Sequence, residues 1–171
     1  SLLIKTKPSN LNSFVINKVK SGKIKMYLEL FYNEDFKLEN FITRGEVNNL
    51  YANFFKDLKL KETNFNFFAD SSDVLIKNIN SSMDGVIIRD GNLQIIKNKK
   101  IIVKSDFNSK IELDNQNIGN YYKIFKNLNL QNRKTKINAD VDNFVNLTFD
   151  ETYKLINYEY KNKGNVKEIS I

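Results

Sequence analysis

The chain has 171 residues, of which 41% are hydrophobic and 27% are charged, a length and composition typical of one domain with its own core. It contains no cysteine and no histidine, which excludes disulfides, cysteine nucleophiles, the usual zinc sites and every histidine-based triad. The net charge is +7, but Arg44, Arg89 and Arg133 are the only arginines, and the lysines are spread along the chain. This favours a solvated surface over the specific phosphate or base recognition for which arginine is preferred.

The first predicted element is a short helix over residues 10–21. Its apolar residues recur at helical spacing, Ser9 or Asn10 can cap its start, and Gly22 can end it in a left-handed turn. The apolar runs of the chain are only a few residues long, against the roughly 20 needed to cross a bilayer, so no transmembrane segment is expected. The chain opens on Ser1 in place of Met, which indicates a fragment of a longer protein.

From residue 23 the hydrophobic period changes to two, which is typical of strands with one apolar and one polar face. A meander of such strands is predicted over residues 23–113, and further strands are predicted over residues 135–171. Between them, aromatic and aliphatic residues at helical spacing predict a second short helix over residues 118–128.

Four segments are turn signals suited to antiparallel hairpins: Asp84-Gly85, Asp90-Gly91, Lys163-Gly164, and Asn98-Lys99-Lys100 between two Ile-rich runs. The strands show neither a fixed-length repeat nor a linker rich in Pro, Gly or Ser, so residues 1–171 are predicted to form one β-rich unit. Strands with one apolar face must cover it, and they can do so with a second sheet, by closing into a barrel, or by curling into a trough for apolar ligands. The strand pattern leaves these three alternatives open.

No group of residues forms a recognisable catalytic or metal-binding motif. Asp140-Val141-Asp142 and Glu151 have the spacing of the ends of a calcium loop, but Phe144 and Val145 occupy positions that need a ligand and a glycine. The six glycines are isolated, so phosphate-binding loops are absent. Aromatic residues alternate with lysines around residues 121–126, where helical spacing explains them as a packed face. We therefore expect no enzymatic activity, cofactor, metal or nucleic-acid partner.

The first two thirds of the chain resemble the AsmA-like envelope proteins, in particular the repetitive β-rich region of the YhdP-type members. Residues 12–24 resemble that family's short amphipathic helix, which ends at a glycine and runs into a strand. Residues 41–50, with Gly45 at their centre, resemble its strand-glycine-strand step. The alternating segment over residues 58–67 and the meander over residues 85–113 continue the resemblance, which fades after Asn115.

This resemblance implies an extended antiparallel meander curled into an open groove, apolar inside and polar outside. It implies a non-enzymatic protein of a Gram-negative envelope that binds or conducts phospholipid acyl chains between the inner and outer membranes, on the periplasmic side, with an inner-membrane anchor outside this segment. The residues expected to line the groove are Ile24, Met26, Leu28, Leu30, Phe65, Phe67, Ile101, Val103, Phe107, Ile137, Ala139 and Val141. The alternative is a closed β-sandwich or barrel that serves as a structural or adhesion module of a surface protein, in which the same residues form an ordinary core.

Overall fold

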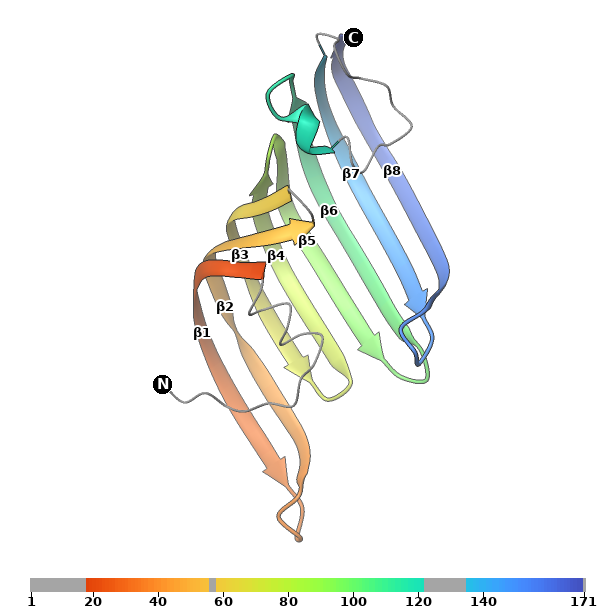
Figure 1. Ribbon diagram of the computed structural model, residues 1–171. Helices are drawn as coiled ribbons and strands as arrows, with labels where there is room; N and C mark the ends of the chain where they lie inside the picture. The colour runs from red at the N-terminus through yellow and green to blue at the C-terminus, as the bar shows by residue number, and fades with distance from the viewer. Residues whose placement is uncertain (1–17, 56–57, 122–134, 171) are drawn as a thin grey trace.

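The computed structural model describes residues 18–55, 58–121 and 135–170, and its strands form one antiparallel sheet (Figure 1). The strand order in the sheet is the order in the chain, so β1 and β8 are its two edges. The strands are β1 (Val19–Tyr32), β2 (Leu38–Phe55), β3 (Leu58–Asp70), β4 (Asp73–Met83), β5 (Val86–Lys97), β6 (Ile101–Leu113), β7 (Lys136–Phe149) and β8 (Leu155–Ser170). The prediction of a mainly β, antiparallel meander is confirmed, and the described strands form an open sheet instead of a sandwich or barrel.

The predicted helices lie partly outside the described residues. The helix over residues 10–21 falls mostly there, and its last residues, from Val19, belong to β1. The helix over residues 118–128 begins as a short 3-10 helix, η1 (Ile118–Tyr121), and the rest of it falls outside the described part of the chain.

Two of the four predicted turns are confirmed and two are wrong. Asn98-Lys99-Lys100 joins β5 to β6. Asp84-Gly85 joins β4 to β5, whereas Asp90-Gly91 lies inside β5 and Lys163-Gly164 lies inside β8. Asp90 has a φ of 50°, so the left-handed conformation that favours Asp and Gly serves a bulge here. Gly164 pairs with Val141, and a Cβ at Gly164 would overlap the backbone of β7. In both places the turn-type residue therefore serves an irregularity within a strand.

A row of bulges crosses the sheet from β2 to β5. Each of these strands has a left-handed residue where its pairing register shifts, with φ values between 50° and 56°. These residues are Asn49, Glu62, Asn78 and Asp90. Because a bulge bends its strand, a row of aligned bulges bends the sheet, and Figure 1 shows β1, β2 and β3 turning sharply. We call this row the crease.

Asparagine side chains hold the crease together. Asn64 accepts a hydrogen bond through Oδ1 from the N–H of Asn49 at 2.9 Å, and donates one through Nδ2 to the carbonyl of Glu62 at 2.7 Å. One strand further on, Asn80 accepts a hydrogen bond from the N–H of Asp90 at 3.4 Å and donates one to the carbonyl of Asn78, the left-handed residue of its own strand, at 3.0 Å. Each asparagine thus satisfies backbone groups on two neighbouring strands.

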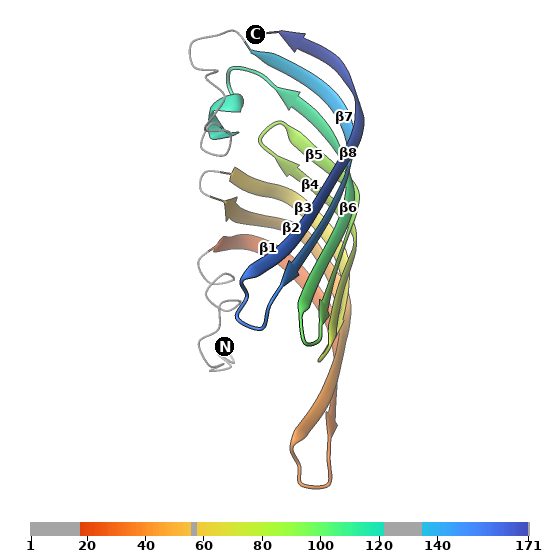
Figure 2. The same cartoon turned by 90° about the vertical axis from the view of Figure 1, so that its right-hand side faces the viewer.

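The one cluster of buried apolar side chains in the described part of the chain lies at one end of the sheet. Ile118 and Tyr121 of η1 pack there with Leu58 and Leu113, and partly buried residues surround them. Figure 2 shows η1 on the inner side of the bent sheet. The side chains it covers therefore identify the face that points inward.

Candidate functional site

The strand register places all of the predicted lining residues on one face of the sheet. Paired residues in neighbouring strands share a face, as do residues two apart within a regular strand. One unbroken row of pairs crosses the eight strands through Met26, Gly45, Phe67, Ile76, Leu93, Ser105, Val145 and Tyr160. A second row runs through Leu28, Thr43, Ala69, Val74, Ile95, Val103, Leu147 and Tyr158. Alternation along each strand places the remaining predicted residues on the same face: Ile24 and Leu30 on β1, Phe65 on β3, Ile101 and Phe107 on β6, and Ile137, Ala139 and Val141 on β7.

We call this surface the apolar face, and it is the inner face of the bend. Ile118 and Tyr121 pack against partly buried apolar residues of several strands, all of which belong to it: Met83, Val86, Ile111 and Ile137. At the usual spacing between strands, each row extends about 34 Å across the sheet. The structure therefore joins segments that are far apart in the chain into one continuous surface.

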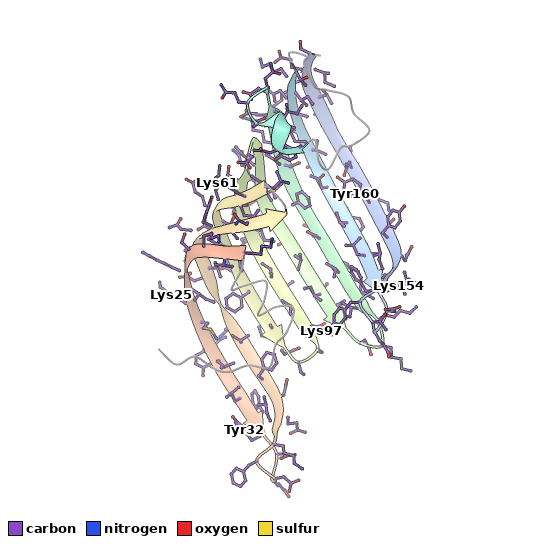
Figure 3. All side chains as sticks on the ribbon, in the orientation of Figure 1. Lys25, Tyr32, Lys61, Lys97, Lys154 and Tyr160 are labelled. Atoms are coloured by element: carbon purple, nitrogen blue, oxygen red, sulfur yellow. The ribbon has the colours of Figure 1, made fainter. Side chains whose placement is uncertain are left out.

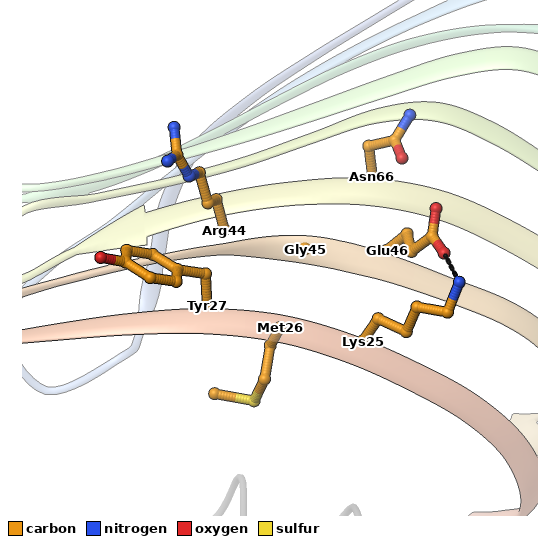
Figure 4. Close-up of a pocket in the computed structure, with 7 residues that line it drawn as sticks. All are labelled: Lys25, Met26, Tyr27, Arg44, Gly45, Glu46 and Asn66. Atoms are coloured by element: carbon orange, nitrogen blue, oxygen red, sulfur yellow. Dashed lines mark ion pairs between the residues drawn. The ribbon is translucent and has the colours of Figure 1, made fainter.

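The opposite face is mixed and largely polar. The row between the two apolar rows runs through Tyr27, Arg44, Phe68, Leu75, Gln94, Lys104, Asn146 and Glu159. At its β1 end, the Arg44 guanidinium stacks over the Tyr27 ring at 5.3 Å, and Lys25 Nζ lies 3.2 Å from Glu46 Oε1 (Figure 4). These groups surround a shallow hollow of about 330 Å³ in which the charges pair with each other.

Several large side chains of the apolar face are exposed, most of all near the edges. Met26 and Leu28 on β1 keep 54% and 47% of their surface accessible, and Tyr158, Tyr160 and Val166 on β8 are also exposed. Figure 3 shows side chains standing along the strands, with Tyr160 labelled on β8. In the described part of the chain, only η1 packs over this face as a separate element.

A buried hydroxyl pair, Thr63 and Ser81 at 2.6 Å, interrupts the apolar face between β3 and β4, and a polar cluster interrupts it between β6 and β8. The Asn143 amide nitrogen donates to Ser109 Oγ at 2.9 Å and to the carbonyl of Val141 at 3.0 Å. The Tyr160 hydroxyl donates to Asn143 Oδ1 at 3.3 Å. Because Asn143 is satisfied by the chain itself, the cluster fixes the register of three strands and is not arranged to bind a ligand.

The sequence prediction missed the central strands of this face. Residues of β4 and β5 such as Val74, Ile76, Leu93 and Ile95 belong to it as fully as the predicted ones. In these segments both the odd-numbered and the even-numbered positions are apolar, so alternation does not show which of them share a face. The bulges at Asn78 and Asp90 also exchange the faces of odd and even positions within each strand. The positive-φ propensity of Asn and Asp is the only signal in the sequence that indicates such an exchange.

The described residues contain no group of three or more Asp or Glu side chains that could hold a metal ion. No helix among them is long and apolar enough to cross a membrane. Comparison of the chain with family models, curated proteins and solved structures gave no match. The candidate site therefore rests on the geometry of the apolar face alone.

Tyr121, the last residue of η1 and a member of the buried cluster, makes the free energy of unfolding depend on pH in the alkaline range. Burial, with a smaller contribution from the charge of Asp84, raises the pKa of Tyr121 to about 12. Its hydroxyl donates to the carbonyl of Met83 at 2.5 Å. The unfolded chain loses this proton near pH 10 while the folded chain keeps it, so the free energy of unfolding falls as the pH rises from 10 to 12.

We expect this loss to amount to about 1–2 kcal/mol, measured by urea unfolding at several pH values between 9 and 12. Tyr121→Phe is expected to cost about 1 kcal/mol at pH 8, because the hydrogen bond is lost, and to flatten the pH profile in that window. The ion pair of Lys61 with Asp84, at 2.9 Å, is present in both proteins, so its contribution to the pH dependence is the same in both. An equal slope in the two proteins would show that Tyr121 is not the titrating group.

Proposed function

We propose that this chain is a non-enzymatic segment of an AsmA-like envelope protein that binds phospholipid acyl chains along its apolar face. In this proposal the bent sheet is an open groove, and the apolar face is its lining. The observation that carries the proposal is the pair of rows that cross all eight strands on the inner side of the bend, with polar residues limited to a few satisfied positions.

The binding mechanism would be burial of hydrocarbon. Each methylene removed from water contributes about 0.8 kcal/mol, so an acyl chain lying along part of a row of about 34 Å gains substantial free energy without any specific pocket. Along the two rows the lining has no charged side chain, and its two aliphatic hydroxyls, on Thr43 and Ser105, donate to backbone carbonyls, which suits a surface along which chains can move. The headgroups would remain in water beyond the lining, where neighbouring lysines provide weak attraction for phosphate.

The cellular setting follows from the same proposal. A groove for acyl chains serves a protein that works between two membranes, so we place the chain on the periplasmic side of a Gram-negative envelope. Its anchor in the inner membrane would be supplied by a segment outside this sequence. Phospholipids are the proposed partners.

The test compares paired variants on the two faces of β1. Met26 and Leu28 lie on the apolar face with 54% and 47% of their surface exposed, and Tyr27 and Phe31 lie on the opposite face with 54% and 41% exposed. Met26→Asp/Leu28→Asp places two charges on the proposed lining. Tyr27→Asp/Phe31→Asp places the same charges on the same strand, at nearly equal exposure, on the other side.

The measurement is mass spectrometry of lipids that co-purify with each folded protein, with circular dichroism and unfolding midpoints as the check on folding. We expect phospholipid in the parent and in Tyr27→Asp/Phe31→Asp, and a loss of most of it in Met26→Asp/Leu28→Asp. Parent protein without lipid, or an equal loss in both variants, would contradict the proposal. A parent that is lipid-free and associates through its apolar face would favour a structural or adhesion module instead.

A further inference from the structure

The loop that joins β7 to β8 repeats in sequence the loop that joins β1 to β2. The segment Tyr32–Leu38 reads YNEDFKL, and the segment Phe149–Leu155 reads FDETYKL. Glu, Lys and Leu are identical at their positions, and the remaining changes include Tyr for Phe, Phe for Tyr and Asp for Asn. The same offset aligns Asn10-Leu11-Asn12 with Asn127-Leu128-Asn129 in the sequence. The strands themselves keep no strict fixed-length repeat, and the sequence prediction missed this loop match because most of its substitutions are conservative.

The two loops also have the same geometry. The first loop residue, Asn33 or Asp150, accepts hydrogen bonds through Oδ1 from the N–H groups of the third and fifth residues, at 3.1 and 2.9 Å in one loop and at 2.8 and 3.0 Å in the other. Its own N–H donates to the carbonyl of the fifth residue at 3.0 Å in both. The fourth residue, Phe36 or Tyr153, is left-handed, with φ of 60° or 63°. A shared conformation this specific supports the sequence match.

The second strand of each hairpin also has a glycine on the apolar face, backed by its partner strand. The two glycines are offset by one position of that face, because the alignment of the loops places Gly164 at the position of Val47, which pairs with Phe65 of β3. A Cβ at Gly45 would lie 2.9 Å from Met26 Cα, and a Cβ at Gly164 would lie 2.8 Å from Val141 Cα. The neighbours differ in one respect. Phe67 of β3 lies over Gly45, with its ring 2.9 Å from the same Cβ position, whereas no strand pairs with the other side of β8 among the described residues.

We infer that the free edge of β8 binds a strand with the chemistry of β3, with an aromatic residue opposite Gly164. The β2–β3 interface is the template, since β8 stands in the second hairpin where β2 stands in the first. By the same argument the free edge of β1 corresponds to the edge of β7 that pairs with β6, so it should bind a β6-like strand. The two edges therefore have different partners, and this holds whatever the apolar face binds.

Main-chain hydrogen bonds and side-chain pairing both support this specificity. An edge strand presents unpaired N–H and C=O groups that any strand can satisfy, and the side chains that meet across the new pair decide which strand fits. On the apolar face, β8 presents Tyr160, Gly164 and Val166. A partner that alternates Phe with polar residues, as β3 does at Phe65 and Phe67, continues the apolar face and fills the space left by the glycine.

The test adds synthetic hairpins in trans to the full chain and follows amide hydrogen exchange at the two edges. A peptide of residues 58–83, which contains β3 and β4, is expected to slow exchange in β8 about tenfold and to leave β1 unchanged. A peptide of residues 86–113, which contains β5 and β6, is expected to protect β1 and leave β8 unchanged. The 58–83 peptide with Phe65→Asp/Phe67→Asp is the matched control and should lose its effect.

A tethered version decides the question if the free peptides associate with themselves. Residues 56–83 are appended after Ile171, so that the natural β2–β3 connection follows β8. We expect the appended hairpin to raise the urea midpoint of unfolding and to protect β8, and the same chain with the two Phe→Asp changes to do neither. Protection of both edges by either hairpin, or no protection from the tethered hairpin, would overturn the inference. Lipid plays no part in these readouts, so their failure is separate from failure of the proposed function.

Discussion

Gly45→Ala is expected to destabilise the chain by about 3 kcal/mol, a large share of the stability of an ordinary domain. Gly45 lies in a row that crosses the sheet, between Met26 on β1 and Phe67 on β3. An added Cβ would overlap the carbonyl oxygen of Lys25 and would lie 2.9 Å from both Met26 Cα and Phe67 Cζ. Because two of these three atoms are backbone, the strands themselves must separate to accommodate the methyl group.

Two other glycines are the controls for this change. Gly119→Ala should be close to neutral, because no heavy atom lies within 4 Å of its Cβ position. Gly91→Ala should have an intermediate cost, because its nearest contacts, Ile79 Cβ, the Ile79 carbonyl oxygen and Phe107 Cβ, lie at 3.1–3.3 Å and need to shift by only a few tenths of an ångström. Urea unfolding of the three variants measures the order of their stability losses. A Gly45→Ala protein as stable as the Gly119→Ala protein would mean that β1 and β2 are not paired in this register.

The outer strands of the sheet could be predicted because their alternation is unbroken over long runs. β6 and β7 pair from Ile101↔Phe149 to Leu113↔Ile137 without a register shift, so period two alone assigns Val103 and Val141 to the same face. β1 alternates just as regularly from Ile24 to Leu30. The predicted lining residues come from these strands and from Phe65 and Phe67, which lie on one side of the β3 bulge.

The bends of the sheet could not be predicted because the sequence does not distinguish a turn from a bulge. Both use Asp, Asn or Gly in the left-handed conformation, and only the pairing of the neighbouring strands decides between them. Asp84-Gly85 ends a strand, whereas Asp90-Gly91 continues one, with Gly91 paired to Ile79. The crease depends on four such positions lying side by side in different strands, and this is a property of the register.

The asparagines of the crease are expected to be as important for stability as any buried side chain of the sheet. In the variant Asn64→Ala/Asn80→Ala, four hydrogen bonds between side chain and backbone are lost, two from each asparagine. These bonds are exposed, so each contributes about 0.5–1 kcal/mol, and we expect the free energy of unfolding to fall by about 2–4 kcal/mol. The two single losses should not be additive, because Asn64 and Asn80 pair across β3 and β4 and support adjacent bulges.

Asn66→Ala is the matched control, because Asn66 lies on the same strand and the same face as Asn64 but is exposed and outside the crease. It should change stability by less than about 0.5 kcal/mol. Glu62→Gly separates the backbone from the side chains, since glycine adopts the left-handed conformation without the cost of about 1 kcal/mol that Glu62 bears at a φ of 51°. We expect that variant to be at least as stable as the parent, with Asn64 still bonded to the carbonyl at position 62. If the double asparagine variant unfolded at the same urea concentration as Asn66→Ala, the bend would be maintained by strand pairing alone, and the asparagines would only follow it.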